Sequence, residues 1–209
     1  MKLTWLGHAC FLVEQGGYRI LLDPYTDVEG YPSLAEQKLQ VHNILCSHGH
    51  FDHNAVDQAE VVPFDGPCPF TIRTVETFHD GEGGALRGPN TIHILSADGV
   101  AVAHLGDLGH PLSPEQVEAI GPLDAVLIPV GGTYTVDAAG AKAVCEALNP
   151  KCVIPMHYRH APYGLPNVAG VEDFLSLWPV GAVRRLEGPV CEVDGGASGV
   201  LVPQFLQEA

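Results

Sequence analysis

The segment Cys46–Asn54 reads CSHGHFDHN and places three histidines and one aspartate within six residues, His48, His50, Asp52 and His53. Imidazole and carboxylate are ligands that zinc, manganese and iron all accept. His48 and His50 lie two residues apart in a tight loop, so both rings can face one ion. Asp52 and His53 then point to the other side. One loop that supplies two diverging pairs of ligands predicts a site for two divalent metal ions.

Other histidines and carboxylates follow the apolar runs elsewhere in the chain. The runs YRILL, NILC, TIRTVETF, VAVAHLG and VIPM each lead into such a residue. These residues are Asp23, His48, His79, Asp107 and His157. Because ligands bind at the carboxyl ends of strands in layered α/β folds, we expect the five side chains to converge. Asp107, in GDLG, is the candidate bridge between two ions, since flanking glycines allow close backbone approach.

The same runs predict a fold rich in strands. LTWL, CFLVEQ and YRILL, with a turn at Gly16-Gly17, predict a hairpin. TIHILSADGVAVAHL predicts a second hairpin that turns at Asp98-Gly99. The apolar runs VHNILC, TIRTVETF, DAVLIPV and KCVIPM predict strands buried on both faces.

Fewer helices are expected. The sequence SPEQ at Ser113 is a capping box with proline at the first helical position, which predicts a helix to about Ile120. Asp137 is expected to cap a second helix, and a third is expected over residues 171–178. A short helix should follow His53. Helices interspersed among buried strands predict a layered α/β sandwich.

Length and charge narrow the class of protein. The 209 residues suit one domain, 1–209, and the net charge of −15 argues against a nucleic-acid substrate. No apolar run reaches the roughly 18 residues of a membrane span. The first residues lack the order of a signal peptide, so a cytoplasmic protein is expected. The six cysteines form no C-x-x-C pair and are expected to be buried thiols. The oligomeric state is left open.

The motifs together resemble a known superfamily. HGHFDH matches the H-x-H-x-D-H signature of the metallo-β-lactamase superfamily, and the four isolated residues Asp23, His79, Asp107 and His157 match its remaining motifs in order. The stretches WLGHACFLVE…ILLDP and IPVGGTYTVDAAGA…IPMHY resemble the small UlaG-like metal-dependent hydrolases, the group that includes L-ascorbate-6-phosphate lactonase. The resemblance covers nearly the whole chain. It implies a four-layer αββα sandwich with a dinuclear site along one edge.

The resemblance also implies a role for each residue. His48, His50 and His79 would bind the first ion, Asp52, His53 and His157 the second, and Asp107 would bridge them. Asp23 would orient the histidine loop through hydrogen bonds. His8, in GHAC, is a candidate for the substrate site.

Some of these residues have a purely structural alternative. His79 could be the stem of a mobile glycine-rich loop, FHDGEGGALRGPN, and His8 an ordinary strand histidine. Arg159 and His160 follow His157 and could meet an anionic substrate, or they could belong to a solvated loop.

The expected function is a metal-dependent hydrolase of a small molecule. A metal-bound hydroxide would attack a lactone, ester, amide or phosphodiester of a neutral or anionic substrate, with Asp52 or Asp107 orienting it and moving the proton. Two divalent ions are expected, with zinc favoured over manganese or iron. One alternative is a non-catalytic metal-binding sensor or scaffold, although every expected ligand is present. Another is a phosphodiesterase related to phospholipase D, which shares the GHA…DP pattern.

Overall fold

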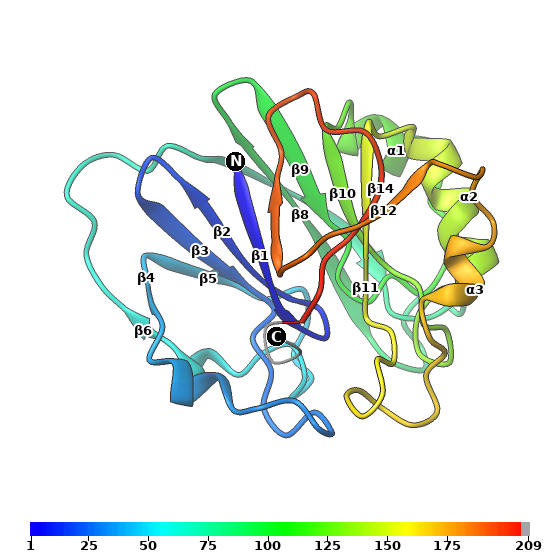
Figure 1. Cartoon of the computed structure of the whole chain (residues 1–209), viewed down its shortest axis with the longest axis horizontal. Helices are drawn as coiled ribbons and strands as arrows, with labels where there is room; N and C mark the ends of the chain where they lie inside the picture. The colour runs from blue at the N-terminus through cyan, green and yellow to red at the C-terminus, as the bar shows by residue number, and fades with distance from the viewer. Residues whose placement is uncertain (206–209) are drawn as a thin grey trace.

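The computed structural model describes residues 1–205 as two β-sheets packed face to face, with helices on the outside (Figure 1). The first sheet has five strands in the order β13-β1-β2-β3-β5. Their bounds are Lys2–Gly7 for β1, Cys10–Gln15 for β2, Tyr18–Leu22 for β3, Asn43–Leu45 for β5 and Val190–Glu192 for β13. The predicted first hairpin therefore forms the centre of this sheet, and β13 joins it from the other end of the chain.

The second sheet has seven strands in the order β12-β14-β11-β10-β9-β8-β7. Their bounds are Thr71–Phe78 for β7, Pro89–Ala97 for β8, Val100–His104 for β9, Ala125–Pro129 for β10, Cys152–Met156 for β11, Val183–Arg185 for β12 and Gly199–Val202 for β14. Every residue of β10 and β11 is buried, as their apolar runs predicted. The same prediction was wrong for β7, which is an edge strand with mostly exposed residues, because its apolar residues alternate with Thr, Arg and Glu.

Helices cover the outer side of the seven-stranded sheet (Figure 1). They are α1 (Pro114–Ile120), α2 (Ala138–Leu148) and α3 (Glu172–Leu175). The predicted capping box is present, since the backbone N–H of Gln116 donates to Ser113 Oγ over 3.2 Å. Asp137 caps α2 as expected. The third helix is shorter than predicted, because the last turns before Trp178 tighten to bonds between residues three apart.

Beside the five-stranded sheet lie shorter elements. They are the 3-10 turns η1 (Leu34–Gln37) and η2 (Val56–Gln58) and the two-stranded pair β4 (Gln40–Val41) with β6 (Glu60–Val61). The short helix expected after His53 is thus the single turn η2. With the helical layer on the other side, the arrangement is the predicted αββα sandwich.

Strand direction brings the predicted residues to one edge of the sandwich. In the first sheet β1 and β3 are both antiparallel to β2, and β5 is parallel to β3. In the second sheet β9, β10 and β11 are parallel, and β7 is separated from β9 by one antiparallel strand. The carboxyl ends in each sheet therefore point the same way. Backbone hydrogen bonds join these ends across the sheets, from Thr91 to Ser47 (2.8 Å) and from His157 to His8 (3.2 Å).

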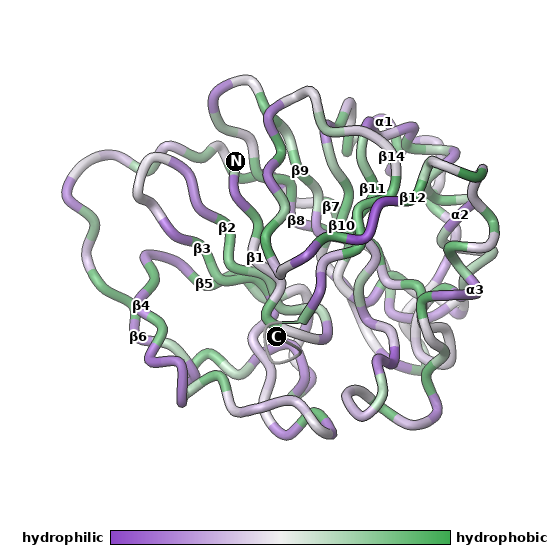
Figure 2. The backbone as a smooth tube through the Cα atoms, viewed as in Figure 1, coloured by the Kyte–Doolittle hydropathy of each residue, from purple (hydrophilic) through white to green (hydrophobic). Residues whose placement is uncertain are grey.

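The core lies between the sheets and runs through both of them as one cluster of buried apolar side chains. Figure 2 shows hydrophobic stretches along the inner strands and a hydrophilic stretch along edge strand β12. Trp5, Phe11 and Ile94 are among the fully buried side chains of this cluster. Within residues 1–205, no helix has both the length and the apolar character to cross a membrane.

Candidate metal centre

The structure brings all seven predicted ligand residues to the same edge. The ligand atoms of His48, His50 and His79 lie within 4.8 Å of one another, as the implied first set requires. A second group, with the same 4.8 Å spread, contains the implied second set together with one further residue. This group is His8, Asp52, His53 and His157. His8, which the resemblance offered for the substrate site, therefore sits directly beside the second set of ligands.

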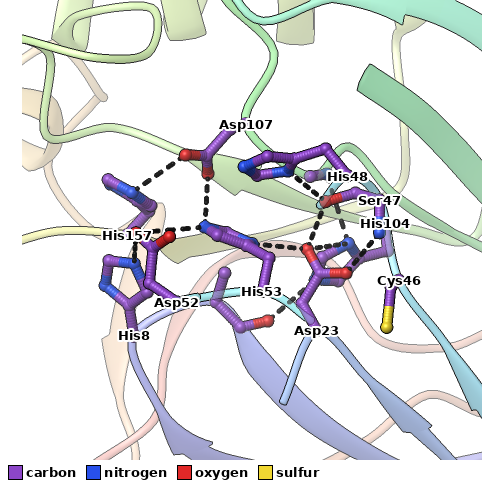
Figure 3. A network of polar contacts seen from close by, with 12 residues as sticks. His8, Asp23, Cys46, Ser47, His48, Asp52, His53, His104, Asp107 and His157 are labelled. Carbon is purple, nitrogen blue, oxygen red and sulfur yellow. Dashed lines mark hydrogen bonds and ion pairs between the residues drawn. The ribbon is translucent and has the colours of Figure 1, made fainter. Parts of the chain in front are cut away.

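Asp107 lies between the two groups (Figure 3). Its Oδ1 is 3.1 Å from His53 Nε2, and its Oδ2 is 3.0 Å from His79 Nε2 and 3.2 Å from His157 Nε2. The residue can approach so closely because Gly106 precedes it. A Cβ at Gly106 would overlap Ser47 Cβ and Asn90 Oδ1, and the glycine has a φ of +54°. One carboxylate thus faces histidines of both groups.

Asp23 holds the histidine loop from below. It accepts hydrogen bonds from the backbone N–H and the hydroxyl of Ser47, both at 2.6 Å, and from Nδ1 of His53 at 2.7 Å (Figure 3). The Ser47 hydroxyl also lies 2.9 Å from Nδ1 of His48. These contacts leave the Nε2 atoms of His48 and His53 facing the cluster. They are the hydrogen bonds that the sequence predicted for Asp23.

Three residues at this edge have a left-handed backbone although they are not glycine. They are His8 (φ 50°), Asp23 (φ 44°) and His157 (φ 51°), and each directly follows strand β1, β3 or β11. The conformation costs about 1–2 kcal/mol for such residues. Strain of this kind persists where the surroundings hold it in place, and it clusters at functional sites.

The carboxylates at the centre are held ionised. Burial opposes ionisation of Asp107, but the charges of His157 and His53 keep its pKa well below the ordinary value. Burial also opposes ionisation of Asp23, yet His104 and His53 lower its pKa to about 2. For His53 burial is outweighed by Asp107 and Asp23, which raise its pKa well above the usual value. The same carboxylates would favour a bound cation near His53.

Two other histidines are held neutral. Burial, followed by the charge of His53, lowers the pKa of His48 to about 3. Burial, followed by the charge of His157, lowers the pKa of His8 to about 4. A metal ion binds the neutral imidazole, so both rings are in the state that can ligate.

Several buried atoms of the cluster lack a hydrogen-bond partner among the described residues. These atoms are Nε2 of His48, Nε2 of His53, Nδ1 of His79, Oδ1 of Asp107 and both ring nitrogens of His157. Buried polar atoms without partners are rare in proteins, so their concentration here fits bound metal. The donors are nitrogen and oxygen only. The half-buried thiol of Cys46 points away from the cluster (Figure 3), and burial raises its pKa to about 12.

A loop over the first ligand group is built on Asp80, which sequence reasoning missed. Its carboxylate accepts four backbone hydrogen bonds of 2.7–3.0 Å, from Glu82, Gly84, Leu86 and Arg87. Burial acts against ionisation, yet these hydrogen bonds lower the pKa of Asp80 to about 2. The glycine-rich segment after His79 is therefore an organised loop. An aspartate directly before a glycine run is a known turn pattern and was the available signal.

A cavity of about 590 Å³ opens beside the ligands. Its lining includes His50, Asp52, His79 and Asp107 together with Gly49, Phe51, Arg87, Tyr134 and Leu165. Arg159, a predicted substrate residue, is exposed and is not part of this lining, and His160 lines a different cavity. Arg87 and Tyr134 were not foreseen, because no motif marks them.

A two-sheet sandwich with a histidine and aspartate cluster at the carboxyl ends of its strands is an architecture suited to binding metal ions. A family model described as a beta-lactamase superfamily domain matches residues 2–157. A UPF0173 metal-dependent hydrolase of Carboxydothermus hydrogenoformans is 31% identical over 83% of this chain and 91% of its own length. A UPF0173 protein of Pyrococcus furiosus is 33% identical over 83% and 89%.

A solved structure agrees with these relatives. The crystal structure of a protein from Thermotoga maritima, described as a Zn-dependent hydrolase of the metallo-β-lactamase superfamily, aligns with a TM-score of 0.76 and 37% identity, over 98% of both chains. The chain thus belongs to the metallo-β-lactamase superfamily, in a family of metal-dependent hydrolases. The narrower likeness to the UlaG-like group stays a prediction.

Proposed function

We propose that this chain is a dinuclear metal-dependent hydrolase of small lactones, esters or phosphodiesters. The observation that carries the proposal is the position of Asp107. Its two carboxylate oxygens lie 3.0–3.2 Å from histidines of both groups, which supports the proposal that Asp107 would bridge two ions. His48, His50 and His79 would hold the first ion, and Asp52, His53 and His157 the second.

The chain's own residues have defined tasks in this proposal. Two bound divalent ions, of which zinc is favoured over manganese and iron, would supply a Lewis acid and lower the pKa of a water to give the nucleophile. Burial opposes ionisation of Asp52, but its contact with His8 and the charge of His53 hold its pKa well below the ordinary value. Asp52 is therefore ionised and can accept a hydrogen bond, and it lies on the cavity wall where it can orient the nucleophile.

The cavity supports a small substrate. Its volume of about 590 Å³ falls within the range of small-molecule sites. The chain's net charge of −15 disfavours a nucleic acid. Lactones, carboxylic esters and phosphodiesters all present an oxygen that a Lewis acid can polarise, so all three are candidate substrates. Assaying a panel of the three also separates a phospholipase D-like phosphodiesterase from an esterase or lactonase.

The test is metal content together with turnover in wild type, Asp107→Asn and Asp124→Asn. Asp124 is a buried aspartate outside the cluster, where it accepts a hydrogen bond from Lys151 over 2.7 Å. We expect about two ions per chain in wild type, turnover on one ester class, and loss of turnover with chelator. Asp107→Asn removes the shared charge, so metal content should fall toward one and turnover should collapse. The Asp124→Asn variant should retain about two ions per chain.

Two results would contradict the proposal. Metal bound without turnover on any of the three classes would favour the non-catalytic sensor or scaffold. Two ions and full turnover in Asp107→Asn would refute the bridging role.

A further inference from the structure

We propose that Arg87 binds an anionic group of the substrate, so that the enzyme acts on small molecules carrying an oxyanion beside the hydrolysed bond. This inference rests on the proposed hydrolase function and names its substrate class. The oxyanion could be a carboxylate or a phosphate group, because an arginine fork accepts both.

The loop built on Asp80 positions this arginine. The backbone N–H of Arg87 donates to Asp80 Oδ2 over 2.7 Å, so the segment that carries Arg87 is fixed to the residue next to ligand His79. Arg87 also lines the cavity beside the metal cluster. An arginine whose backbone is held in this way loses less freedom on binding a ligand than one on a mobile loop.

The guanidinium of Arg87 keeps most of its hydrogen-bonding capacity. It lies 5.7 Å from the ring centroid of Tyr134, and Nη2 donates one long hydrogen bond of 3.3 Å to the carbonyl of Thr133. No carboxylate of the described chain lies within ion-pair distance of it. Because a guanidinium carries five N–H donors, several remain for a ligand.

The side chain of Tyr134, the cation-π partner of Arg87, is itself held in place by hydrogen bonds. Asn167 donates to the Tyr134 hydroxyl over 2.7 Å, and its carbonyl accepts a 2.6 Å hydrogen bond from Thr133. The ring of Tyr134 therefore gives the guanidinium a fixed cation-π partner in the same cavity lining. Stacking on an aromatic ring restricts an arginine without neutralising its charge.

Charge and shape point to an anion attached to an apolar body. Arg87 is the one lining residue of this cavity, among those described, whose side chain is always cationic, in a chain of net charge −15. An anion that enters this cavity would therefore meet Arg87 as a permanently positive side chain. Phe51 and Leu165 line the same cavity, and Phe51 is 56% exposed. They offer an apolar surface to the part of the substrate between its oxyanion and the hydrolysed bond.

The first test is binding to the metal-loaded protein, measured by calorimetry with 2-naphthoate, 2-naphthylphosphonate and uncharged 2-naphthamide. Arg87→Gln should weaken binding of the anions about 10- to 100-fold and leave the amide unchanged, because a charge-assisted hydrogen bond is lost. The anion affinity of Arg87→Lys should lie between those of wild type and Arg87→Gln, since lysine keeps the positive charge but not the forked pair of donors. Arg184→Gln, on exposed edge strand β12, is the matched control and should behave as wild type. The anion that wild type binds more tightly identifies whether a carboxylate or a phosphate-like group is preferred.

The second test compares hydrolysis of phenyl acetate with that of the monophenyl ester of succinate, which adds a carboxylate. Arg87→Gln should raise the KM for the succinate ester about 10- to 100-fold, with little change in kcat, and leave phenyl acetate unaffected. Anion binding equal to wild type in Arg87→Gln, or its loss in Arg159→Gln instead, would overturn the inference. If wild type hydrolyses neither ester, the proposed function is in doubt, whereas the binding result still decides the role of Arg87.

Discussion

Asp23 shows how a residue outside the ligand set can control the site. It contacts Ser47 and His53 at 2.6–2.7 Å and is fully buried, so its negative charge and its geometry are both fixed. Through His53 it sets which ring nitrogen faces the cluster, and through Ser47 it holds the start of the loop that carries four of the proposed ligands.

Replacing Asp23 by asparagine should therefore weaken metal binding without removing a ligand. We expect metal affinity to fall about 10- to 100-fold, the usual loss when such an orienting partner is removed. Competition with a chromophoric chelator measures the affinity. The control is Asp27→Asn, at an exposed position four residues away. Wild-type affinity in Asp23→Asn would show that the hydrogen bonds do not orient the ligands.

Gly106 makes the approach of Asp107 possible, and a pair of glycines tests this. Gly106→Ala should destabilise the fold by about 1–3 kcal/mol more than Gly99→Ala and should lower metal content. Both glycines have positive φ, but a Cβ at Gly99 meets nothing within 4 Å, whereas one at Gly106 meets Ser47 and Asn90. Denaturant unfolding and metal analysis measure the two effects. Equal stability of the two variants would mean that the loop moves aside without cost.

Sequence reasoning predicted the residues that the structure brings into the cluster, but not the residues around them. His48 and Asp107 were found because their side chains have few other uses at strand ends. Asp80 was missed although an aspartate before a glycine run is a turn signal, and Arg87 was missed because no spacing rule links it to that aspartate. The family resemblance offered His8 for the substrate site. Its 3.3 Å contact with Asp52 was not predicted, because that contact depends on how two loops meet.

At the scale of elements, short sequence motifs correctly predicted the helix caps and hairpin turns, which depend on only a few neighbouring residues. The capping box of α1 and the turns of both hairpins form as their residues indicated. The predicted length of α3 and the predicted burial of β7 were wrong, because both depend on the elements that pack beside them. The position of β7 at the edge follows from sheet order, although the polar residues that interrupt its apolar run are consistent with an exposed strand.

Helix α1 offers a test of stability apart from function. Ser113→Ala removes the hydroxyl that accepts the N–H of Gln116, so the free energy of unfolding should fall by about 1 kcal/mol. Metal content and turnover should not change, since Ser113 belongs to none of the ligand groups. Ser113→Asn, which keeps a capping acceptor, should restore most of the stability. A loss of metal in Ser113→Ala would show that α1 and the site are coupled.

At the scale of the molecule, we propose that residues 1–209 form a single domain. The support is one apolar cluster that runs through both sheets of the described chain. The ligands come from both sheets, so metal should stabilise the whole fold. We expect one cooperative unfolding transition, and a lower midpoint once metal is chelated, because binding to the native state adds about 4 kcal/mol at a thousandfold excess over Kd. Two separate transitions in calorimetry would contradict the single domain.

The pairing of β1 with β13 has a consequence for the order in which the protein forms during synthesis. Lys2 lies opposite Glu192, so β1 is synthesised long before the strand that pairs with it. Until then the nascent chain exposes one long side of its first sheet, and such unpaired edges can associate with other chains. Contacts between such distant residues slow folding. Emergence of residues 190–192 from the ribosome, rather than completion of the proposed ligand set by residue 157, should therefore set when the five-stranded sheet closes.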